Sequence, residues 1–477
     1  MYRTNLSYIQ KGEKKMKKLI SLFTVISLVL SMLVMGAFSV SAAWDGTTVA
    51  TGFASGTGTE ADPFVIATPE QLAYLAQSVK GGETYDGKFI ALSADIDLGG
   101  KEWMPIGLYK YENTANNDFP FKGSFDGKGY TVSNYVIKAG NNTIYAGLFG
   151  YAGGASCVIK NLTVAKANVA GKNYAGTVVG CFVGKALVGI TVEDDCTVTG
   201  KASVGGVAGR IVGGEGTYLV NKGTVTGTGN DNSAFIGGIC GATGASSVIS
   251  YCVNLGTVGG DVAFAGGVVG ITGLSALDAT LSAPAGGATI ENCYNAGTVK
   301  YEAATTNRYV GGIAARFVNA QSQTTVIKNT YNLGTVDCTV TSAIYGEVCG
   351  QVRYSGITFE NVFSVDIADM DLFKSGKVAD GVDVSPVVNK TEAEIKALTA
   401  VIDAKIAENK VTPPAAPETS APETTAPAAP ETTAPETNAP TTQPTTPPAT
   451  GDVSAIILAA VCVTGLAAAM VAKKKER

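Results

Sequence analysis

A glycine-rich phrase recurs seven times through the middle of the chain and constrains its fold more than any other feature. Each copy has five residues, mostly with glycine at both ends and branched apolar residues between, as in Gly205-Gly206-Val207-Ala208-Gly209. The copies end at Gly150, Gly180, Gly209, Gly241, Gly270, Ala315 and Gly350, 29 to 45 residues apart. Periods of about 20–50 residues indicate a solenoid, a propeller or a linear array.

A second phrase, Asn-x-Gly-Thr-Val, follows four of these copies. The surrounding units are rich in Val, Ile, Thr and Gly, and they lack the 3.6-residue spacing of helical repeats. A propeller needs about forty or more residues per blade, so the residues favour a parallel β-helix. The pleat predicts an inward column of Val225, Val258, Val299 and Val336. It predicts an outward column of Thr224, Thr257, Thr298 and Thr335.

The asparagines of the second phrase are predicted to form a structural ladder. Its members are Asn221, Asn254, Asn295 and Asn332. We expect them at a turn, because asparagine tolerates the left-handed backbone conformation. On successive coils, their amides can hydrogen-bond to one another along the solenoid axis.

The repeated phrases resemble GLUG-motif repeats, which occur in bacterial surface and secreted proteins. Residues 62–66, 92–98, 103–107 and 121–127 are also similar to the way such proteins begin, so the resemblance spans about residues 55–365. It implies a right-handed parallel β-helix in an adhesin-like protein. Some relatives carry a zinc peptidase domain, but its HExxH motif is excluded because the chain has no histidine. The family implies no catalytic residues.

Two helices are predicted to flank the repeats. Thr68 to Gln71 form a capping box with Pro69 at the first helical position, and we assign this helix to an N-terminal cap. Its apolar face comprises Leu72, Leu75, Ala76 and Val79. A second capping box at Thr391 opens a helix over 391–409 with Ile395, Leu398, Ile402 and Ile406 on one side. That helix could cover the other end of the solenoid or serve as a spacer.

The first 42 residues have the three parts of a secretory signal peptide. Five lysines between positions 11 and 18 precede an uncharged apolar stretch over 19–38, and small residues follow. Cleavage is predicted after Ala42 or Ala43. An uncleaved membrane anchor is the alternative, because the apolar run is nearly long enough to span a bilayer.

The C-terminal end resembles the sorting signal of Gram-positive cell-wall proteins. Pro448, Thr450 and Gly451 match its Pro-x-Thr-Gly motif, although Pro447 stands where leucine is usual. Residues 453–472 form an apolar transmembrane span, and a basic tail follows it. The resemblance implies that sortase cuts between Thr450 and Gly451 and joins the chain to peptidoglycan. A simple C-terminal membrane anchor is the alternative.

Residues 411–450 are predicted to be a disordered stalk. Eleven of the seventeen prolines lie between positions 412 and 450, where Thr, Ala and Glu fill most of the rest. No aromatic or branched aliphatic side chain is present in 412–450 to offset the entropy of ordering. The full division is 1–42 signal peptide, 43–142 N-terminal cap and first coils, 143–365 repeats, 366–410 C-terminal cap or spacer, 411–450 stalk, and 451–477 sorting span and tail.

Charge and composition exclude several classes of function. Without histidine there is no imidazole base and no Ser-His-Asp or Cys-His pair. The processed chain would carry 25 basic and 37 acidic residues, a net charge of −12, which argues against nucleic acid as a partner. Cationic ligands or a calcium-rich surface fit that charge better. We predict no cofactor.

Few side chains are candidates for chemistry. Asp95 and Asp97 could bind calcium, but turn bonding is the simpler interpretation, and we predict no metal site. The acidic run at 193–195 is interpreted as a solvated loop. Arg210 and Arg316 share a repeat position but lie too far apart to cooperate. Cys252 and Cys293 also share a position, and buried free thiols are expected there, because in-register strands hold parallel Cβ atoms too far apart for an unstrained disulfide.

The leading hypothesis is a non-enzymatic, wall- or membrane-anchored surface protein whose β-helix adheres to host or cell-surface glycans or proteins. The insertions between Ile271 and Ala288 and between Arg316 and Thr325 are the expected contact points. Two alternatives stay open: a carbohydrate-active β-helix that acts on acidic polysaccharide, and a passive surface spacer. Three or more carboxylates in a cleft on adjacent coils would favour the carbohydrate-active alternative.

Overall fold

The computed structural model describes most of the chain between residues 43 and 414. The described ranges are 43–109, 118–140, 143–229, 234–262, 264–274, 286–301, 308–319, 323–338, 343–367, 370–373 and 377–414. They belong to one compact unit, Met1–Ala415. The predicted signal peptide, most of the stalk, and the sorting motif with Pro448, Thr450 and Gly451 lie outside these ranges.

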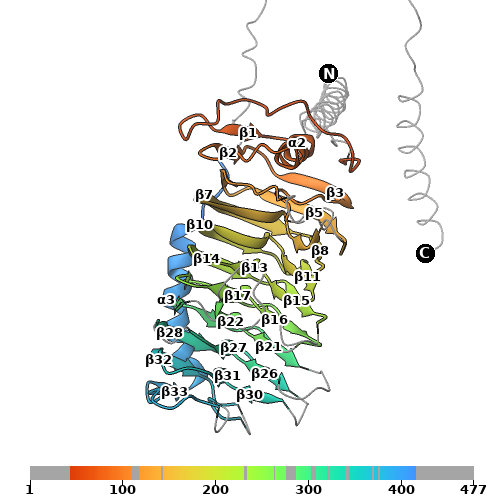
Figure 1. The fold of residues 1–477 in the computed structure, drawn as a ribbon. Helices are drawn as coiled ribbons and strands as arrows, with labels where there is room; N and C mark the ends of the chain where they lie inside the picture. The colour runs from red at the N-terminus through yellow and green to blue at the C-terminus, as the bar shows by residue number, and fades with distance from the viewer. Residues whose placement is uncertain are drawn as a thin grey trace, which may run out of the picture. The chain divides into compact units, whose positions relative to one another are not determined.

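The described residues form an all-β parallel solenoid in which each full coil contributes to four ladders of strands (Figure 1). Every strand pairing within the ladders is parallel and joins strands of neighbouring coils, as expected for a β-helix and not for a propeller. The predicted fold class is therefore confirmed as a β-solenoid. Its right-handedness stays a prediction.

The strands are named here by ladder, in the order in which a coil visits them. Ladder one contains β6 (Tyr145–Ala146), β9 (Tyr174–Gly176), β12 (Ser203–Gly205), β16 (Phe235–Gly237), β21 (Phe264–Gly266), β26 (Tyr309–Gly311) and β30 (Ile344–Gly346). Ladder two contains the first parts of β7 (Phe149–Ala165) and β10 (Val179–Val192), then β13 (Ala208–Ile211), β17 (Cys240–Gly244), β22 (Val269–Leu274), β27 (Ala314–Phe317) and β31 (Cys349–Val352).

Ladders three and four complete each coil. Ladder three contains β1 (Phe64–Ile66), β2 (Phe89–Leu92), β4 (Ser124–Asp126), the second parts of β7 and β10, β14 (Glu215–Asn221), β18 (Val248–Ser250), β19 (Val253–Asn254), β23 (Thr289–Glu291), β24 (Tyr294–Asn295), β28 (Thr325–Asn332), β32 (Ile357–Ser364) and β33 (Val387–Asn389). Ladder four contains the second parts of β3 (Ile96–Glu102) and β5 (Thr131–Ile137), whose first parts belong to ladder three, then β8 (Asn168–Ala170), β11 (Thr197–Gly200), β15 (Thr224–Gly227), β20 (Val258–Gly260), β25 (Val299–Tyr301) and β29 (Val336–Cys338).

The four asparagines of the second phrase form a continuous buried ladder of amides at the turn between ladders three and four. Each Nδ2 donates to the Oδ1 of the next coil, at 2.9 Å from Asn221 to Asn254, 2.8 Å from Asn254 to Asn295, and 3.0 Å from Asn295 to Asn332. The row ends where Asn332 donates to the Ser364 hydroxyl at 3.2 Å. Each amide also bonds the glycine two residues later, as Asn221 does with the N–H and C=O of Gly223.

The asparagine ladder explains the second glycine of the repeated phrase. That glycine lies at the turn between ladders one and two, against the amide of its own coil. A Cβ at Gly206, Gly238, Gly267 or Gly312 would overlap Asn221, Asn254, Asn295 or Asn332, respectively. In two coils without the asparagine the glycine is missing too: Thr177 shares a coil with Val192, and Glu347 shares one with Ser364. The first copy keeps Gly147 in the coil of Val164, where an added Cβ would approach the backbone of Gly176 and Val179 on the next coil. In the coils that have both phrases, the second glycine of the first phrase thus packs against the asparagine of the second phrase.

The last glycine of the phrase permits a second close approach. A Cβ at Gly209 would lie 2.8 Å from the Ala175 nitrogen and 3.0 Å from the Ser203 oxygen. Ladders one and two therefore pack backbone against backbone at this point. The apolar residues within the phrase point inward, and Val178, Val207 and Val268 are fully buried. Burying such a side chain contributes about 1.5–3 kcal/mol.

The valine and threonine columns lie as the pleat predicts. Val225, Val258 and Val299 are fully buried, and Val336 is 6% exposed. The threonines that precede them are exposed or half-exposed, and Thr335 donates to Thr298 on the neighbouring coil at 3.2 Å between the hydroxyl oxygens.

The left-handed backbone is not where we expected it. The ladder asparagines do not have positive φ angles; the residue three positions earlier does. Asn292, Asn329 and Asn361 have φ angles of 53°, 46° and 50°. The same strand position is filled by Asn161, Gly189, Tyr218 and Tyr251 in the earlier coils, all with positive φ. The buried asparagines are selected for their amide bonds and not for their backbone.

Helix α2 (Pro69–Lys80) has the predicted capping box and covers the N-terminal end. The Thr68 hydroxyl accepts from the Gln71 N–H, and the Gln71 side chain accepts from the Thr68 N–H. Its buried face is Leu72, Ala73, Leu75, Ala76 and Val79. Trp44 and Trp103, whose rings meet edge to face at 5.8 Å, lie beneath it and line a cavity of about 390 Å³.

Helix α3 (Glu392–Asn409) begins at the predicted capping box but does not cover the other end. Its buried residues Ile395 and Ile402 pack on Val253, Tyr294 and Tyr331, so the helix lies along the side of the solenoid (Figure 1). Covering the end instead is an irregular last segment, where Phe373 and Val378 bridge to β31 and β33 pairs with β32. The outward aromatic residues of ladder three provide the apolar surface that holds the helix at the side.

Neither of these two helices is long and apolar enough to cross a membrane.

Replacing Gly238 with alanine should destabilise the solenoid by about 1–3 kcal/mol or more, because the added Cβ overlaps the Asn254 amide in a rigid interior. Urea unfolding followed by circular dichroism measures the loss. Gly52→Ala is the matched control, since nothing lies within 4 Å of its Cβ position. Equal unfolding midpoints for the two variants would contradict the proposed role of this glycine.

Candidate functional site

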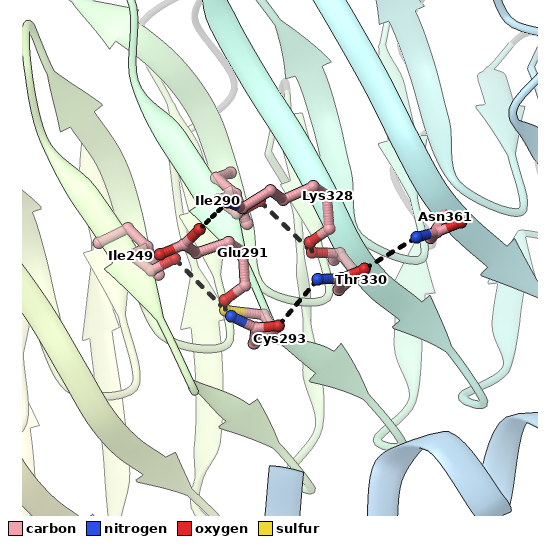
Figure 2. A network of polar contacts seen from close by, with 9 residues as sticks. Ile249, Ile290, Glu291, Cys293, Lys328, Thr330 and Asn361 are labelled. Carbon is pink, nitrogen blue, oxygen red and sulfur yellow. Dashed lines mark hydrogen bonds and ion pairs between the residues drawn. The ribbon is translucent and has the colours of Figure 1, made fainter. Parts of the chain in front are cut away.

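A second row of asparagines lies outside the first, on the face of ladder three that α3 partly covers. Asn361 donates to the Asn329 oxygen at 3.1 Å, and Asn329 donates to the Asn292 oxygen at 3.1 Å. Figure 2 shows the Asn361 end of this row. Sequence reasoning missed the row, but the spacing Asn-x-(Tyr or Phe)-(Asn or Ser) at 292, 329 and 361 could have revealed it.

Small donors fill the position beneath this outer row. The side chains of Cys252, Cys293 and Thr330 donate to the carbonyl two residues earlier, at 3.2, 3.1 and 2.8 Å. Burial, with the neighbouring Cys293, raises the pKa of Cys252 well above its usual range. These small donors occupy the position on three successive coils, and the apolar residues Leu219 and Val362 occupy it on the coils before and after.

An ion pair flanks the row on the neighbouring column. Lys328 Nζ lies 2.8 Å from Glu291 Oε2, and this hydrogen bond raises the pKa of the lysine (Figure 2). Both side chains are partly exposed. The ion pair fixes two neighbouring coils to each other on the face that carries the outer asparagines.

A groove of about 520 Å³ runs between this face and α3. It is lined by Asn329, Tyr331, Asn361, Phe363, Lys390, Glu394, Ala397 and Leu398. The rings of Tyr331 and Phe363 stack with centroids 5.6 Å apart, and Lys390 Nζ lies 4.8 Å above the Phe363 ring. The Glu394 carboxylate lies 3.6 Å from Lys390 and also accepts from the Thr391 N–H in the capping box of α3. We call this the asparagine–aromatic groove.

The groove combines apolar surface with a few fixed polar groups, as small-molecule sites do. Aromatic residues offer apolar surface, and the amides of Asn329 and Asn361 offer both donors and acceptors. Lys390 adds one positive charge. This set can bind a polyhydroxylated ligand.

A second groove of about 480 Å³ lies near the N-terminal end, across β2, β4, β7 and β10. Its charged residues are Glu60, Asp126, Lys128, Lys160 and Lys185. Asp126 lines this groove, with its carboxylate 3.2 Å from Lys128 Nζ and 3.5 Å from Lys160 Nζ. The carboxylate also accepts from Asn161 Nδ2 at 2.9 Å. Burial raises the pKa of Asp126, but these bonds and charges outweigh it and hold that pKa below the usual value.

The two carboxylates of the Asp-Ile-Asp triplet make structural bonds within the solenoid. Asp95 accepts from the Thr131 N–H at 2.8 Å, and Asp97 accepts from the Gly99 N–H at 2.7 Å and from Asn134 Nδ2 at 2.9 Å. The bond from Gly99 to Asp97 is the turn bonding that we expected, whereas the bond from Thr131 to Asp95 joins one coil to the next. Within the described ranges, no three His, Cys, Asp or Glu residues come together in a group that could hold a metal ion.

The acidic run at 193–195 also binds its neighbours. Glu193 pairs with Lys222 at 2.8 Å, and Asp195 accepts from the Lys166 N–H at 2.7 Å. Both carboxylates thus join one coil to the next.

The two arginines are buried and do not meet. Three register steps separate Arg210 from Arg316. Arg210 stacks on Tyr174 at 4.8 Å, and Arg316 lies over Tyr309 and Phe264 at 4.2 and 4.6 Å. Both serve packing at the outer corner of ladders one and two.

The two insertions expected to contact a ligand lie largely outside the described residues, which end at 274 and resume at 286, and end at 319 and resume at 323. Ala43 is the first described residue, and Ala42 precedes it. The predicted signal cleavage after either residue stays a prediction.

Comparisons with known proteins give limited similarity. No family model matches the chain. Halomucin of Haloquadratum walsbyi is 33% identical over 154 residues, which is 30% of this chain and 2% of halomucin. A crystal structure of a candidate immunoglobulin A1 protease from Bacteroides ovatus aligns with 73% of this chain and 90% of its own, at 18% identity and a TM-score of 0.45. The chain thus spans about 2% of the length of the curated relative that it matches.

Denatured protein comprising residues 43–414 should release eight titratable thiols. The eight cysteines of that range are 157, 181, 196, 240, 252, 293, 338 and 349. In the native protein the reaction should be slow, because burial raises the pKa of Cys157, Cys196 and Cys349 to about 12. A chromogenic disulfide reagent in guanidinium, without reductant, counts them. Fewer than eight groups would mean that disulfides form.

Asp126→Asn should remove an acid-dependent part of the stability. Because the folded pKa of Asp126 lies below its unfolded value of about 3.9, the carboxylate stabilises the fold above that pH and loses this effect as pH falls through the folded pKa. Between pH 7 and 2.5, the midpoint temperature of thermal unfolding should fall less steeply in the variant than in the unmodified protein. Asp380→Asn is the control, because Asp380 is exposed on the surface.

Proposed function

We propose that this chain is a secreted, anchored surface protein of the GLUG-repeat type, whose solenoid binds a ligand and does not catalyse a reaction. The ligand class that we favour is a host or cell-surface glycan. The asparagine–aromatic groove carries the proposal, because it brings Tyr331, Phe363, Asn329 and Asn361 to one concave surface. Such a surface suits hydroxyl groups and the apolar faces of sugar rings.

The carboxylate contacts support the non-enzymatic part of the proposal. Asp95, Asp97, Asp126, Glu193 and Asp195 each bind a backbone N–H, a lysine or both within the solenoid. The second groove is lined by two carboxylates, and Asp126 is already engaged by two lysines. A carbohydrate-active β-helix would need carboxylates that remain available to a substrate.

The two ends of the sequence support the location. We infer a signal peptide with cleavage after Ala42 or Ala43, and a sorting signal at Pro448, Thr450 and Gly451 that sortase processes onto peptidoglycan. Residues 453–472 would hold the chain in the membrane before processing. The local similarity to halomucin, a mucin by name, agrees with an extracellular protein.

A glycan array probed with the purified solenoid tests the proposal. Binding should fall at least about tenfold in an Asn361→Ala, Phe363→Ala double variant, which removes an amide and a ring from the groove and so costs about 1.4 kcal/mol or more. Lys396→Ala on the exposed side of α3 is the matched control. Binding that is unchanged in the double variant would exclude this groove as the site.

Product analysis of the bound glycans separates the alternatives. Shortened or unsaturated products would favour a lyase or hydrolase, and neither binding nor products would favour a passive spacer.

A further inference from the structure

The chain beyond the last coil returns along the whole side of the solenoid to its first coils. Helix α3 starts beside Phe363 on β32, where Lys390 lies over the ring. Farther along, Asp403 accepts from the Tyr294 hydroxyl at 2.7 Å. The returning chain appears in Figure 1 in blue, running from the level of β32 to that of β10 and beyond.

The returning chain packs at a specific position near the N-terminal end of the solenoid. A Cβ at Gly129, between β4 and β5, would lie 2.6 Å from the Val411 oxygen and 2.8 Å from the Pro413 nitrogen. Gly129 has a φ of 83°, so glycine is favoured there both by the backbone and by this approach. We call residues 390–414 the return strap.

The contacts of the strap are distributed along its length. Its apolar residues Ile395, Leu398, Ile402 and Ile406 contact the outward residues of ladder three, which are Tyr251, Val253, Tyr294, Tyr331, Leu333, Phe363 and Val365. An 18-residue helix is about 27 Å long, and coils are about 4.8 Å apart, so the helix crosses about five coils. The strap therefore ties together coils that otherwise contact only their neighbours.

This arrangement changes how tension enters the solenoid. If the chain left directly from the last coil, tension on the residues that follow would strip coils one at a time, because each coil is held only by the next. Here the chain leaves at residue 414, beside Gly129. Tension on the residues beyond 414 acts first on the strap. The force runs parallel to the surface on which the strap packs, so many of the strap's contacts resist it at the same time.

We propose that the return strap is a mechanical clamp that bears tension in shear and protects the coils from sequential unfolding. Its action requires only that the chain be pulled from beyond residue 414. The inference goes beyond ligand binding and does not depend on it.

Single-molecule pulling on the full chain tests the clamp. One handle is C-terminal, and the other is on a Thr224→Cys variant, since Thr224 is exposed on β15 in the middle of the stack. The first rupture should release the strap in one event, with about 90 Å of new length for residues 390–414. Repeated early steps of about one coil each, before the strap ruptures, would overturn the proposal.

Matched variants identify the contacts that bear the force. Ile395→Ala with Ile402→Ala, and separately Tyr294→Phe, should lower the first rupture force and leave its length unchanged. Tyr294→Phe preserves the ring and loses only the bond to Asp403, so it keeps the test valid if the double variant does not fold. Lys396→Ala should leave the force unchanged, since Lys396 pairs with Glu392 on the exposed side. Equal rupture forces in Tyr294→Phe and Lys396→Ala would contradict a role for this contact, and equal forces in all variants would overturn the clamp.

Discussion

The contact between the buried asparagine ladder and the glycine turn is the constraint on which the rest of the solenoid depends. Asn221, Asn254, Asn295 and Asn332 have fully buried amides, and a buried amide costs about 1–3 kcal/mol if it lacks partners. The ladder satisfies each amide twice, with the next coil and with the glycine two residues later. The opposite turn must then be glycine, because no Cβ fits against the amide.

That contact fixes the register of every ladder at once. A coil shifted by one residue would separate each asparagine from the next and turn the valine column toward solvent. With the register fixed, the residue three positions before the asparagine always falls at the left-handed bend. Asn292, Asn329 and Asn361 therefore align on the outer face without being part of the core. The surface that we propose for binding is thus a consequence of the register that the core imposes.

The return strap shows how an outward face can serve the fold. Tyr294, Tyr331 and Phe363 would be exposed aromatic residues if the chain simply ended at the last coil. The strap covers part of them, and one edge remains as the asparagine–aromatic groove. The same segment thereby forms one wall of the candidate site and holds distant coils together.

Much of the fold could be predicted from the sequence, because the same local pattern of glycine, valine and asparagine recurs in several coils. The solenoid, the valine column and both capping boxes follow from period, pleat and cap chemistry. The position of α3 could not be predicted, since an apolar helical face indicates that it packs but not on what. The outer asparagine row was missed because Gly189, Tyr218 and Tyr251 occupy the same position in the earlier coils, so the position shares a backbone conformation more than a residue type.

The sequence by itself determined that the chain stacks parallel coils, because only stacking buries the valines and satisfies the asparagine amides. It also determined that no histidine-based site exists anywhere in the chain. Only the tertiary structure decided which carboxylates are engaged by neighbours, where the aromatic rings and amides meet, and where the chain leaves the solenoid. Those features depend on contacts between residues far apart in the chain, such as Gly129 with Val411 and Tyr294 with Asp403, and no local pattern encodes such pairs.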